Sequence, residues 1–421
     1  MAPHEHSLKP RQSGRIGLPA AQRRASAARS RPICIHFGAL LVATAAILMW
    51  LASSAAAAAW TPKKAAEANR VVEQFLLHLN ASHADLPEAA LSLAIGSRGA
   101  LLLAKGYGEA APGVPASAHT VYHVGSIAKQ FTAAAVLDLI SRHAHLRNGT
   151  ALSLDLALAD IFDGVEHWTA QGVGPRNQAV TLRNLLTMTS NLPNFTRRPP
   201  PATNPWGRIG APELLSEVKK MRPWGWPKTF EYSNTSYFLL AEVIEEAVRP
   251  GEARPSAYYD YLRQNIFPRA GLVETGFIGH YAPGSEVAIP VGRRLRVFDQ
   301  PSWLKGSADM TSSAADLFAW NTAFMGGRVL PPEYAALMIT GTGRVSPEIY
   351  YGMGWFVEYR RDHELFSHAG MVPGYTSINM IAAETGGDRG WTSVTLLLNT
   401  DVAPDELQNL AKELMRLTQE R

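Results

Sequence analysis

Three serine–lysine pairs in the sequence have the S-x-x-K spacing that can generate a nucleophile. The pairs are Ser126 with Lys129, Ser216 with Lys219, and Ser302 with Lys305. A serine hydroxyl is a poor nucleophile at its ordinary pKa and needs an adjacent base. On a helix, residues i and i+3 lie on one face, so the lysine amine can reach the hydroxyl.

Only Ser126 follows a glycine and opens a long apolar segment, residues 126–140. A serine in the first turn of a helix keeps its backbone N–H free to donate to a developing oxyanion. Ser216 falls within a short charged segment, and Ser302 follows a proline in a loop. We therefore take Ser126 and Lys129 as the candidate nucleophile and base, with a helix N-cap as the alternative role for Ser126.

The second candidate element is Tyr232-Ser233-Asn234. In an extended chain, residues i and i+2 face the same way, so the phenol and the carboxamide would project together. The phenol can exchange a proton, and the carboxamide can bind a substrate amide or the lysine. The alternative is a surface turn that contains an asparagine.

The third candidate element is His368-Ala369-Gly370-Met371, at the head of the C-terminal strand-like segments. A glycine such as Gly370 lets a ligand approach the backbone closely. The N–H of Met371 could then supply a second oxyanion donor. A histidine beside a strand, such as His368, is alternatively a structural residue.

The segments that must position these elements are strand-like near both ends of the chain and mostly helical between them. Helical spacing marks residues 63–79, 126–140, 181–188, 237–248 and 404–419, and strand-like runs occupy 91–95, 100–105, 376–382 and 392–399. Strands at both ends with helices between predict an α+β fold. We expect one antiparallel sheet built from both chain ends, flanked by helices, with a helical second lobe.

Residues 195–230 interrupt the helical region with seven prolines and three of the ten tryptophans. Apart from a short charged helix near 212–221, the segment reads as irregular. Long irregular loops in compact domains are usually functional covers or disordered, and the tryptophans argue against disorder. We expect a lid or wall that sets substrate choice, with a packed structural loop as the alternative.

Residues 1–59 have the order of an export signal. A basic stretch precedes the uncharged run 37–51, and small residues at 57–59 could be cut by a peptidase. The uncharged run continues to Trp60, which makes it 24 residues long and sufficient for a membrane anchor. A cleaved signal peptide and an anchor in the inner membrane both remain open. Either one places residues 60–421 outside the cytoplasm, in the periplasm or the extracellular space.

Charge and cysteine content exclude several classes of partner and cofactor. The formal charge is +4, but residues 1–36 hold seven basic residues against one acidic, and the remainder holds 33 basic against 35 acidic. The body therefore gives no reason to expect a nucleic-acid partner. Cys34 is the one cysteine, which excludes a disulfide framework and a Cys-rich zinc site. The sequence has no Walker loop and no H-E-x-x-H, so we expect neither a metal nor an organic cofactor.

In their order along the chain, the three elements resemble those of the serine β-lactamase and penicillin-binding-protein superfamily, which are S-x-x-K, Ser/Tyr-x-Asn and K-T-G. The resemblance is to the class C-like branch, with its D-alanyl-D-alanine carboxypeptidases, D-aminopeptidases and family VIII esterases. The stretches that carry it are VYHVGSIAKQFTAAAVLDLI, VTLRNLLTMTSNLPNF, FEYSNTSYFLLAEVIE, GSADMTSSAADLFAW, YGMGWFV and HAGMVPGYTS. Residues 60–421 are thereby identified as one β-lactamase-like serine hydrolase domain with the β-lactamase/transpeptidase-like fold.

The resemblance implies a role for each matching position. Ser126 would be the acylated nucleophile and Lys129 its proton-transfer partner. Tyr232 would be the second acid/base. Asn234 would bind the substrate amide, and His368 would line the site from the opposite strand.

The sequence departs from the family pattern in two places. His368-Ala369-Gly370 stands where K-T-G is expected, and imidazole is mostly neutral at pH 7. A neutral imidazole in place of a lysine ammonium binds a substrate carboxylate less strongly. It also weakens the positive field that would lower the pKa of Tyr232. The resemblance implies that members with histidine here are DD-peptidases, D-aminopeptidases or esterases more often than efficient β-lactamases. The Glu-x-x-Leu-Asn of class A enzymes is absent as well, which leaves Tyr232 with Lys129 to activate water.

We therefore expect a serine hydrolase that acts through an acyl-enzyme on a small-molecule or peptide substrate. That substrate could be a D-amino-acid peptide, a β-lactam or a short-chain ester. One alternative is a penicillin-binding sensor, or pseudo-enzyme, that is acylated without turnover. Another is a cell-envelope interaction module that uses the tryptophan-rich loop for contacts.

Overall fold

The computed structural model describes residues 60–82, 86–170, 178–197, 209–223, 230–248, 256–292, 302–385 and 390–419. The segment predicted to be a signal peptide or membrane anchor, residues 1–59, lies outside these ranges, as do all three tryptophans of the 195–230 loop. Within the described ranges, none of the helices combines the length and the apolar character needed to cross a bilayer.

An eight-stranded antiparallel sheet contains strands from both ends of the described chain. Its strand order is β10-β11-β12-β13-β14-β15-β1-β2. The N-terminal strands are β1 (Leu91–Ser97) and β2 (Ala100–Tyr107), and the C-terminal strands are β10 (Gly343–Arg344), β11 (Ile349–Tyr351), β12 (Phe356–Tyr359), β13 (His363–Val372), β14 (Tyr375–Glu384) and β15 (Trp391–Leu398). Strand β1 pairs with β15 along its whole length, from Leu91 opposite Leu398 to Ser97 opposite Thr392. The prediction of one antiparallel sheet built from both ends is confirmed.

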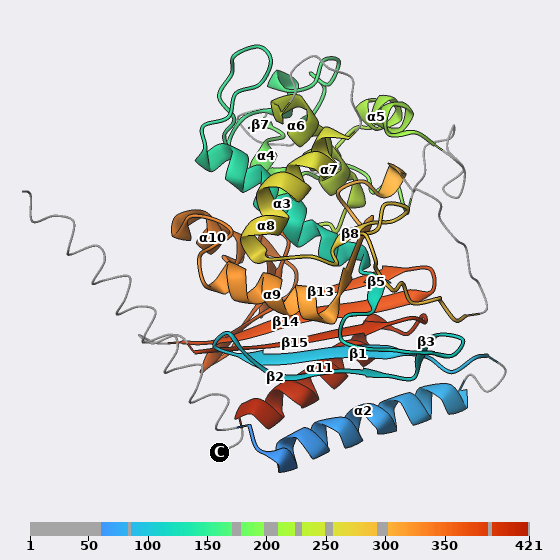
Figure 1. Ribbon diagram of the computed structural model, residues 1–421. Helices are drawn as coiled ribbons and strands as arrows, with labels where there is room; N and C mark the ends of the chain where they lie inside the picture. Colours follow the sequence, from blue (N-terminus) through green and yellow to red (C-terminus); the bar gives the residue numbers. More distant parts are fainter. Residues whose placement is uncertain are drawn as a thin grey trace, which may run out of the picture. The chain divides into compact units, whose positions relative to one another are not determined.

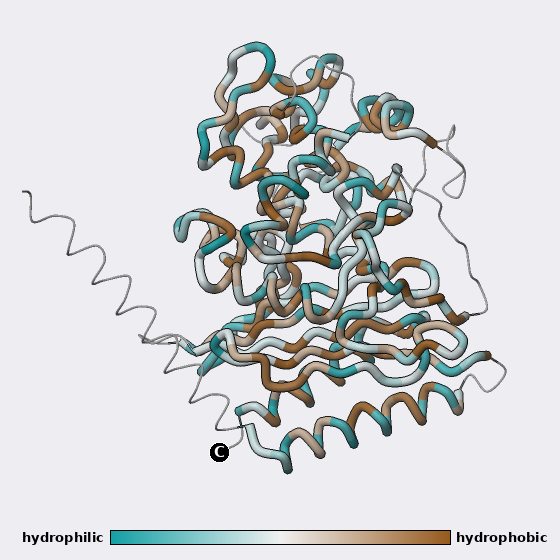
Figure 2. Tube along the Cα trace, in the orientation of Figure 1, coloured by the Kyte–Doolittle hydropathy of each residue, from teal (hydrophilic) through white to brown (hydrophobic). Residues whose placement is uncertain are grey.

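Helices cover both faces of this sheet (Figure 1). On one face lie α2 (Pro62–Ser82) and α11 (Pro404–Gln419), whose buried side chains, such as Val72 and Leu410, join those of the sheet, such as Leu396, in one apolar cluster. Apolar and polar residues alternate along α2 in Figure 2, as expected for a helix with one buried face. On the other face, α9 (Ala314–Met325) packs against β1 and β15.

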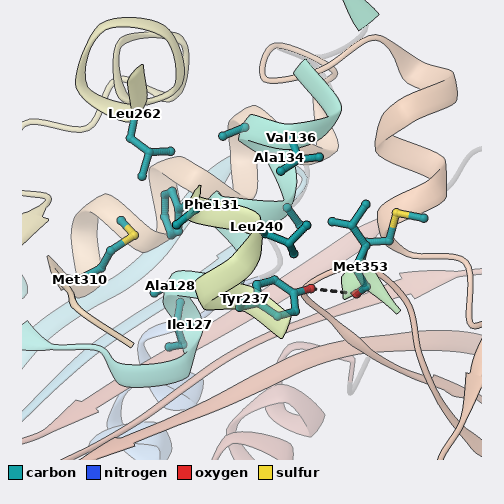
Figure 3. Packing of buried hydrophobic residues seen from close by; sticks show 14 of the residues in the cluster. Ile127, Ala128, Phe131, Ala134, Val136, Tyr237, Leu240, Leu262, Met310 and Met353 are labelled. Atoms are coloured by element: carbon teal, nitrogen blue, oxygen red, sulfur yellow. Dashed lines mark hydrogen bonds between the residues drawn. The ribbon is translucent and has the colours of Figure 1, made fainter. Parts of the chain in front are cut away.

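The helical lobe is built around α3 (Ala128–Ser141), in which every residue from Ala128 to Ile140 is buried. Figure 3 shows Ala128 and Phe131 among side chains that include Leu240 and Leu262. The neighbouring helical segments are α4 (Leu182–Leu186), α5 (Ala211–Lys219), α6 (Asn234–Val248), α7 (Ala257–Tyr261), the π-helical turn η3 (Leu262–Ile266), α8 (Phe267–Ala270) and α10 (Pro332–Met338). The predicted α+β fold with a helical second lobe is therefore confirmed.

A small sheet of order β5-β9-β8 leads into the candidate site. It consists of β5 (Val121–His123), β8 (Gly276–Phe277) and β9 (Met310–Ser313). The remaining short elements are β3 (Glu109–Ala111), β4 (Val114–Pro115), β6 (Thr169–Ala170), β7 (Gln178–Ala179), and the 3-10 turns η1 (Gly125–Ile127), η2 (Leu158–Asp160) and η4 (Ser302–Leu304).

Two local predictions need correction. The helix predicted over 181–188 is only the five residues of α4, because its Thr181 capping box sets the start and Met188 has a left-handed φ of 54° beyond its end. The extended conformation predicted for Tyr232-Ser233-Asn234 is wrong at its last residue, since Asn234 is the first residue of α6.

Candidate active site

Ser126 lies in the 3-10 turn η1, between strand β5 and helix α3. The N-cap residues of η1 and α3 are Val124 and Ile127, and neither helix has a side-chain cap hydrogen bond. The alternative role of Ser126 as an N-cap is therefore wrong. Ser126 is half-buried, whereas its neighbours Gly125 and Ile127 are buried.

Lys129 is fully buried, and its Nζ lies within hydrogen-bonding distance of three uncharged oxygens. These are the Ser126 Oγ at 3.0 Å, the Asn234 Oδ1 at 2.7 Å and the Ser307 carbonyl at 2.8 Å. The two carbonyl oxygens can only accept, so a neutral amine donates to them and can accept from the Ser126 hydroxyl. Burial lowers the pKa of Lys129 well below its usual value, and the charge of Asp309 opposes this shift only in part. The environment favours the neutral amine, which is the form that can act as a base.

The two other S-x-x-K pairs have different surroundings. Lys305 is also buried, but its Nζ lies 2.8 Å from a carboxylate oxygen of Glu242 and 2.9 Å from one of Glu245. These carboxylates raise the pKa of Lys305 against the effect of burial, and the Ser302 hydroxyl donates instead to the carbonyl of Ile209. Ser216 lies in the middle of α5, as expected. The pair at 126 and 129 joins a serine to a buried lysine whose pKa is lowered by burial.

Tyr232 completes a three-residue cluster with Ser126 and Lys129. The phenol hydrogen-bonds with Ser126, and the Lys129 Nζ lies 4.9 Å from the centre of the Tyr232 ring. Burial raises the pKa of Tyr232, while the Ser126 hydrogen bond and the charge of Arg197 oppose the shift. At neutral pH the phenol therefore keeps its proton and can donate it. The structure brings together the alcohol, the amine and the phenol from segments about a hundred residues apart.

Asn234 and its partner Asn194 hold this cluster in place. The Oδ1 of Asn234 accepts from Lys129, and its Nδ2 donates to the Thr196 hydroxyl at 3.0 Å. Asn194 Nδ2 donates to the Tyr232 carbonyl, and its Oδ1 accepts from the Asn234 backbone N–H, each at 3.3 Å. Both polar ends of the Asn234 side chain thus have partners within the protein, and its binding of a substrate amide stays a prediction. Asn194 and Thr196 were not predicted as site residues; Asn194 lies in the VTLRNLLTMTSNLPNF stretch, and Thr196 directly follows it.

His368 lies in β13 and is 1 % exposed. Its Nδ1 is 2.7 Å from the Ala369 carbonyl, which can only accept, so Nδ1 carries the proton and Nε2 accepts from the Tyr351 hydroxyl at 3.2 Å. Burial, assisted by the charge of Lys129, lowers the pKa of His368 to about 3. The imidazole is therefore neutral at pH 7, and its ring lies 6.0 Å from that of Tyr232.

An aromatic wall continues from His368 around the phenol. Phe356 stacks on Tyr232 with ring centres 6.3 Å apart, and Tyr351 meets both rings edge-on. The side of the site occupied by His368 is therefore aromatic and uncharged.

Gly370 and Met371 lie where β13 passes close to η1. A Cβ added at Gly370 would collide with the carbonyl oxygen of Val124. Gly125 has a left-handed φ of 51°, and a Cβ added there would lie 2.6 Å from the backbone nitrogen of Met371. Glycine is required at both positions for this close approach.

The N–H of Met371 is oriented away from the neighbouring strand. Val372 faces Tyr375 across a two-residue turn, and Met371 faces Thr376 at the next position of the ladder. Facing residues in an antiparallel ladder alternate between hydrogen-bonded and non-hydrogen-bonded pairs. The Met371 amide therefore points out of the β13–β14 ladder, beside the residue that precedes Ser126.

A family model described as Beta-lactamase matches residues 73–417. The chain belongs to the beta-lactamase family. The match includes all seven predicted site residues, and the resemblance deduced from the motifs is confirmed.

Two bacterial relatives share about a quarter of their aligned residues with this chain, and one of them carries a penicillin-binding name. The chain is 26% identical over 305 residues to the putative penicillin-binding protein PbpX of Bacillus subtilis (strain 168), which covers 70% of this chain and 64% of that protein. It is 24% identical over 343 residues to protein flp of Staphylococcus aureus (strain MRSA252), covering 77% of this chain and 62% of that protein. The chain thus spans less than two thirds of the length of either relative.

Solved structures show the same fold at low sequence identity. The octameric penicillin-binding protein homologue from Pyrococcus abyssi has a TM-score of 0.64 and 22% identity, with 83% of this chain and 77% of that chain covered. The D-amino acid amidase from Ochrobactrum anthropi SV3, complexed with L-phenylalanine amide, has a TM-score of 0.62 and 21% identity, with 84% and 100% covered.

Across the described ranges, no cluster of three or more histidine, cysteine, aspartate or glutamate side chains is arranged to hold a metal ion.

Proposed function

We propose that this protein is a serine hydrolase that forms an acyl-enzyme at Ser126 with an amide or ester substrate. One observation carries the proposal: a fully buried lysine amine lies 3.0 Å from the serine hydroxyl, and the three oxygens within its hydrogen-bonding distance are all uncharged. Family membership supports hydrolysis, and the structural similarity to a D-amino acid amidase favours amides.

In the first step Lys129 is the base. The Ser126 O–H bond breaks, its proton forms an N–H bond on Nζ, and Oγ bonds to the substrate carbonyl carbon. The carbonyl oxygen becomes an oxyanion, which the N–H groups of Ser126 and Met371 bind. Such a donor is typically worth about 3 kcal/mol in the transition state. Lys129 suits this role better than Tyr232 because burial lowers the pKa of the lysine and raises that of the tyrosine.

In the second step Tyr232 is the acid. Its phenol gives a proton to the leaving nitrogen or oxygen as the carbon–leaving-group bond breaks, and the ammonium of Lys129, 4.9 Å from the centre of the Tyr232 ring, returns a proton to the phenolate. Water then attacks the carbonyl carbon of the acyl-enzyme. Its proton goes to the Tyr232 oxygen as the phenol proton moves to Lys129. Ser126 regains its hydrogen when the acid product leaves.

The uncharged surroundings of His368 bear on the substrate class. A neutral imidazole cannot pair with a substrate carboxylate as a lysine ammonium would. This supports D-amino-acid amides or peptides and short-chain esters ahead of β-lactams that depend on a carboxylate clamp. We also propose that residues 1–59 export the domain as a signal peptide or anchor. N-terminal sequencing of the protein from cell fractions tests this part.

The experiment is intact-mass analysis over time with a fluorophosphonate, a p-nitrophenyl ester, a penicillin and a D-amino-acid amide. We expect one fluorophosphonate adduct on Ser126 and steady turnover of the ester or the amide, and we expect Ser126→Ala to abolish both while the protein stays folded. Wild-type-like turnover by Ser126→Ala would end the proposal.

A penicillin-binding sensor is the second candidate, because the relatives carry penicillin-binding names. A stable penicilloyl adduct, with a burst of one product equivalent and no steady-state rate, would favour it. Failure of every reagent to modify Ser126 would instead favour the interaction module.

A further inference from the structure

A buried carboxyl group, that of Asp309, lies near the proposed base. Asp309 is 2 % exposed and directly precedes β9. Its Oδ1 accepts from the Gly306 backbone N–H at 3.2 Å, its Oδ2 has no hydrogen-bond partner among the described residues, and the Tyr259 phenol lies close enough to lower its pKa. The mechanism proposed above makes no use of Asp309, and a buried carboxyl group is costly to keep unless something depends on it.

The turn that Asp309 holds is the one that binds Lys129. Ser307 and Ala308 both donate backbone hydrogen bonds to the Leu304 carbonyl, at 2.8 and 2.9 Å, and close the turn. Gly306 adopts a left-handed φ of 71°, which favours glycine.

Two successive carbonyls of this turn face helix α3. The Gly306 oxygen accepts from the Thr132 hydroxyl at 2.7 Å, and the Ser307 oxygen accepts from the Lys129 Nζ at 2.8 Å. Asp309 binds the amide of Gly306, the residue whose oxygen meets Thr132. The position of the Ser307 carbonyl therefore depends on the carboxyl group of Asp309.

The charges around Asp309 show which group its own charge acts upon. The titratable and charged side chains that interact with it are Lys129 from α3, Tyr258 and Tyr259 from α7, and Lys305 after η4. Glu245 from α6 acts on the two tyrosines. Lys305 is already paired with Glu242 and Glu245. Lys129 has no such pair among the described residues, and Asp309 is the carboxyl group whose charge raises its pKa.

We propose that Asp309 is a positioning residue for Lys129: it fixes the turn that presents the Ser307 carbonyl to the amine, and its negative charge stabilises the ammonium that forms when Lys129 takes the Ser126 proton. This inference rests on the proposed function, in which that proton transfer is the first step. The ammonium would otherwise form in a buried site whose other contacts are neutral, and attraction by a nearby carboxylate offsets part of that cost.

The direction of the pH effect follows from the charges. Burial raises the pKa of Asp309 to about 7, so the carboxylate is partly ionised around neutral pH. The anion raises the pKa of Lys129, so its removal lowers that pKa. Because the neutral amine is the active base, the acidic limb of the kcat/KM profile moves to lower pH when the charge is lost. The base is also weaker in that case, so kcat falls.

The decisive variant is Asp309→Asn, which keeps an oxygen acceptor for the Gly306 amide and removes only the charge. We expect kcat for a p-nitrophenyl ester to fall roughly tenfold with KM nearly unchanged, and the acidic limb to move down by about one pH unit, the size of shift that a nearby charge produces. The matched control is Asp316→Asn, another buried aspartate, which accepts from the backbone N–H groups of Val273 and Glu274. Its pH profile should match wild type.

Tyr259→Phe is a second, milder test that keeps the ring, whose centre lies 4.6 Å from that of Phe277. The Tyr259 phenol lowers the pKa of Asp309, so removing its hydroxyl leaves the carboxylate ionised over a narrower pH range. The acidic limb of the kcat/KM profile should move to lower pH, as in Asp309→Asn, but by a smaller amount. If Asp309→Asn does not fold, this variant decides the outcome.

Rates are taken per labelled active site, with circular dichroism to confirm folding. The inference would be overturned if folded Asp309→Asn or folded Tyr259→Phe had the kcat of the wild type and the same acidic limb of the kcat/KM profile. In that case, labelling of Ser126 by the fluorophosphonate would still support the proposed function. If wild-type Ser126 itself is not labelled, the proposed function has failed, and the role of Asp309 fails with it.

Discussion

Gly125→Ala tests the second oxyanion donor, because the added methyl group would occupy the space in front of that donor. The Cβ would lie 2.6 Å from the Met371 nitrogen, closer than carbon and nitrogen atoms approach without a bond or hydrogen bond. The left-handed φ of 51° adds backbone strain, about 1–2 kcal/mol for a residue other than glycine. Either η1 and β13 move apart or the Met371 amide is covered, and in both cases the amide loses the oxyanion.

Loss of one oxyanion-hole donor typically lowers kcat by about 100- to 1,000-fold, equivalent to about 2.7–4 kcal/mol. We expect a drop of that size for a p-nitrophenyl ester, with a much smaller change in KM because the oxyanion exists only after attack. The assay is steady-state hydrolysis, with fluorophosphonate titration to count folded sites.

Gly327→Ala is the matched control. Gly327 has a similar φ of 68°, and a Cβ added there meets nothing within 4 Å. This variant carries the strain without the contact, so its melting temperature should fall while kcat stays near wild type. If folded Gly125→Ala keeps kcat within about threefold, well below the usual loss, the Met371 amide is not an oxyanion donor.

Three further substitutions test the remaining side chains. Lys129→Ala should lower kcat/KM by at least about 100-fold, which is the usual contribution of an acid/base group. A loss below about tenfold in steady-state assays would mean that the amine is only structural. Tyr232→Phe removes the proton given to the leaving group, so amide hydrolysis should fall by about 100-fold or more and far more than hydrolysis of a nitrophenyl ester, whose leaving group needs no proton; equal losses for both substrates would contradict the role of Tyr232. The pKa of His368 is about 3 in the folded protein, below its value of about 6.5 in the unfolded chain. Between these values the unfolded chain binds the extra proton. The folded state therefore loses stability as the pH drops from about 6.5 toward 3. His368→Gln should flatten the pH dependence of Tm in that window, and an unchanged slope by calorimetry would show that another group is responsible.

The element types and the family could be predicted from the sequence because both depend on short-range patterns. Alternation and helical spacing reflect which face of each segment is buried, and the predicted strands and most helices are present. The order of the three motifs was sufficient to predict the family that the comparison confirmed. The errors fell at boundaries, as at Asn234, where i, i+2 geometry was assumed and a helix begins.

The three S-x-x-K pairs show where local information ends. Spacing alone did not separate them, and a preceding glycine and an apolar helix were needed to select Ser126. The structure adds the chemical difference. Lys305 is charged because α6 brings two glutamates to it, whereas Lys129 meets only neutral oxygens.

The sequence by itself determined the residue types that can react, the segments that carry them and the family they belong to. Tertiary structure alone decided the protonation state of each group and the contributions of Asn194, Thr196 and Asp309. The physical reason is that a pKa depends on burial and on the nearest charges and dipoles. At this site those neighbours lie from about 65 to 180 residues away from Lys129 along the chain, so no local pattern encodes them.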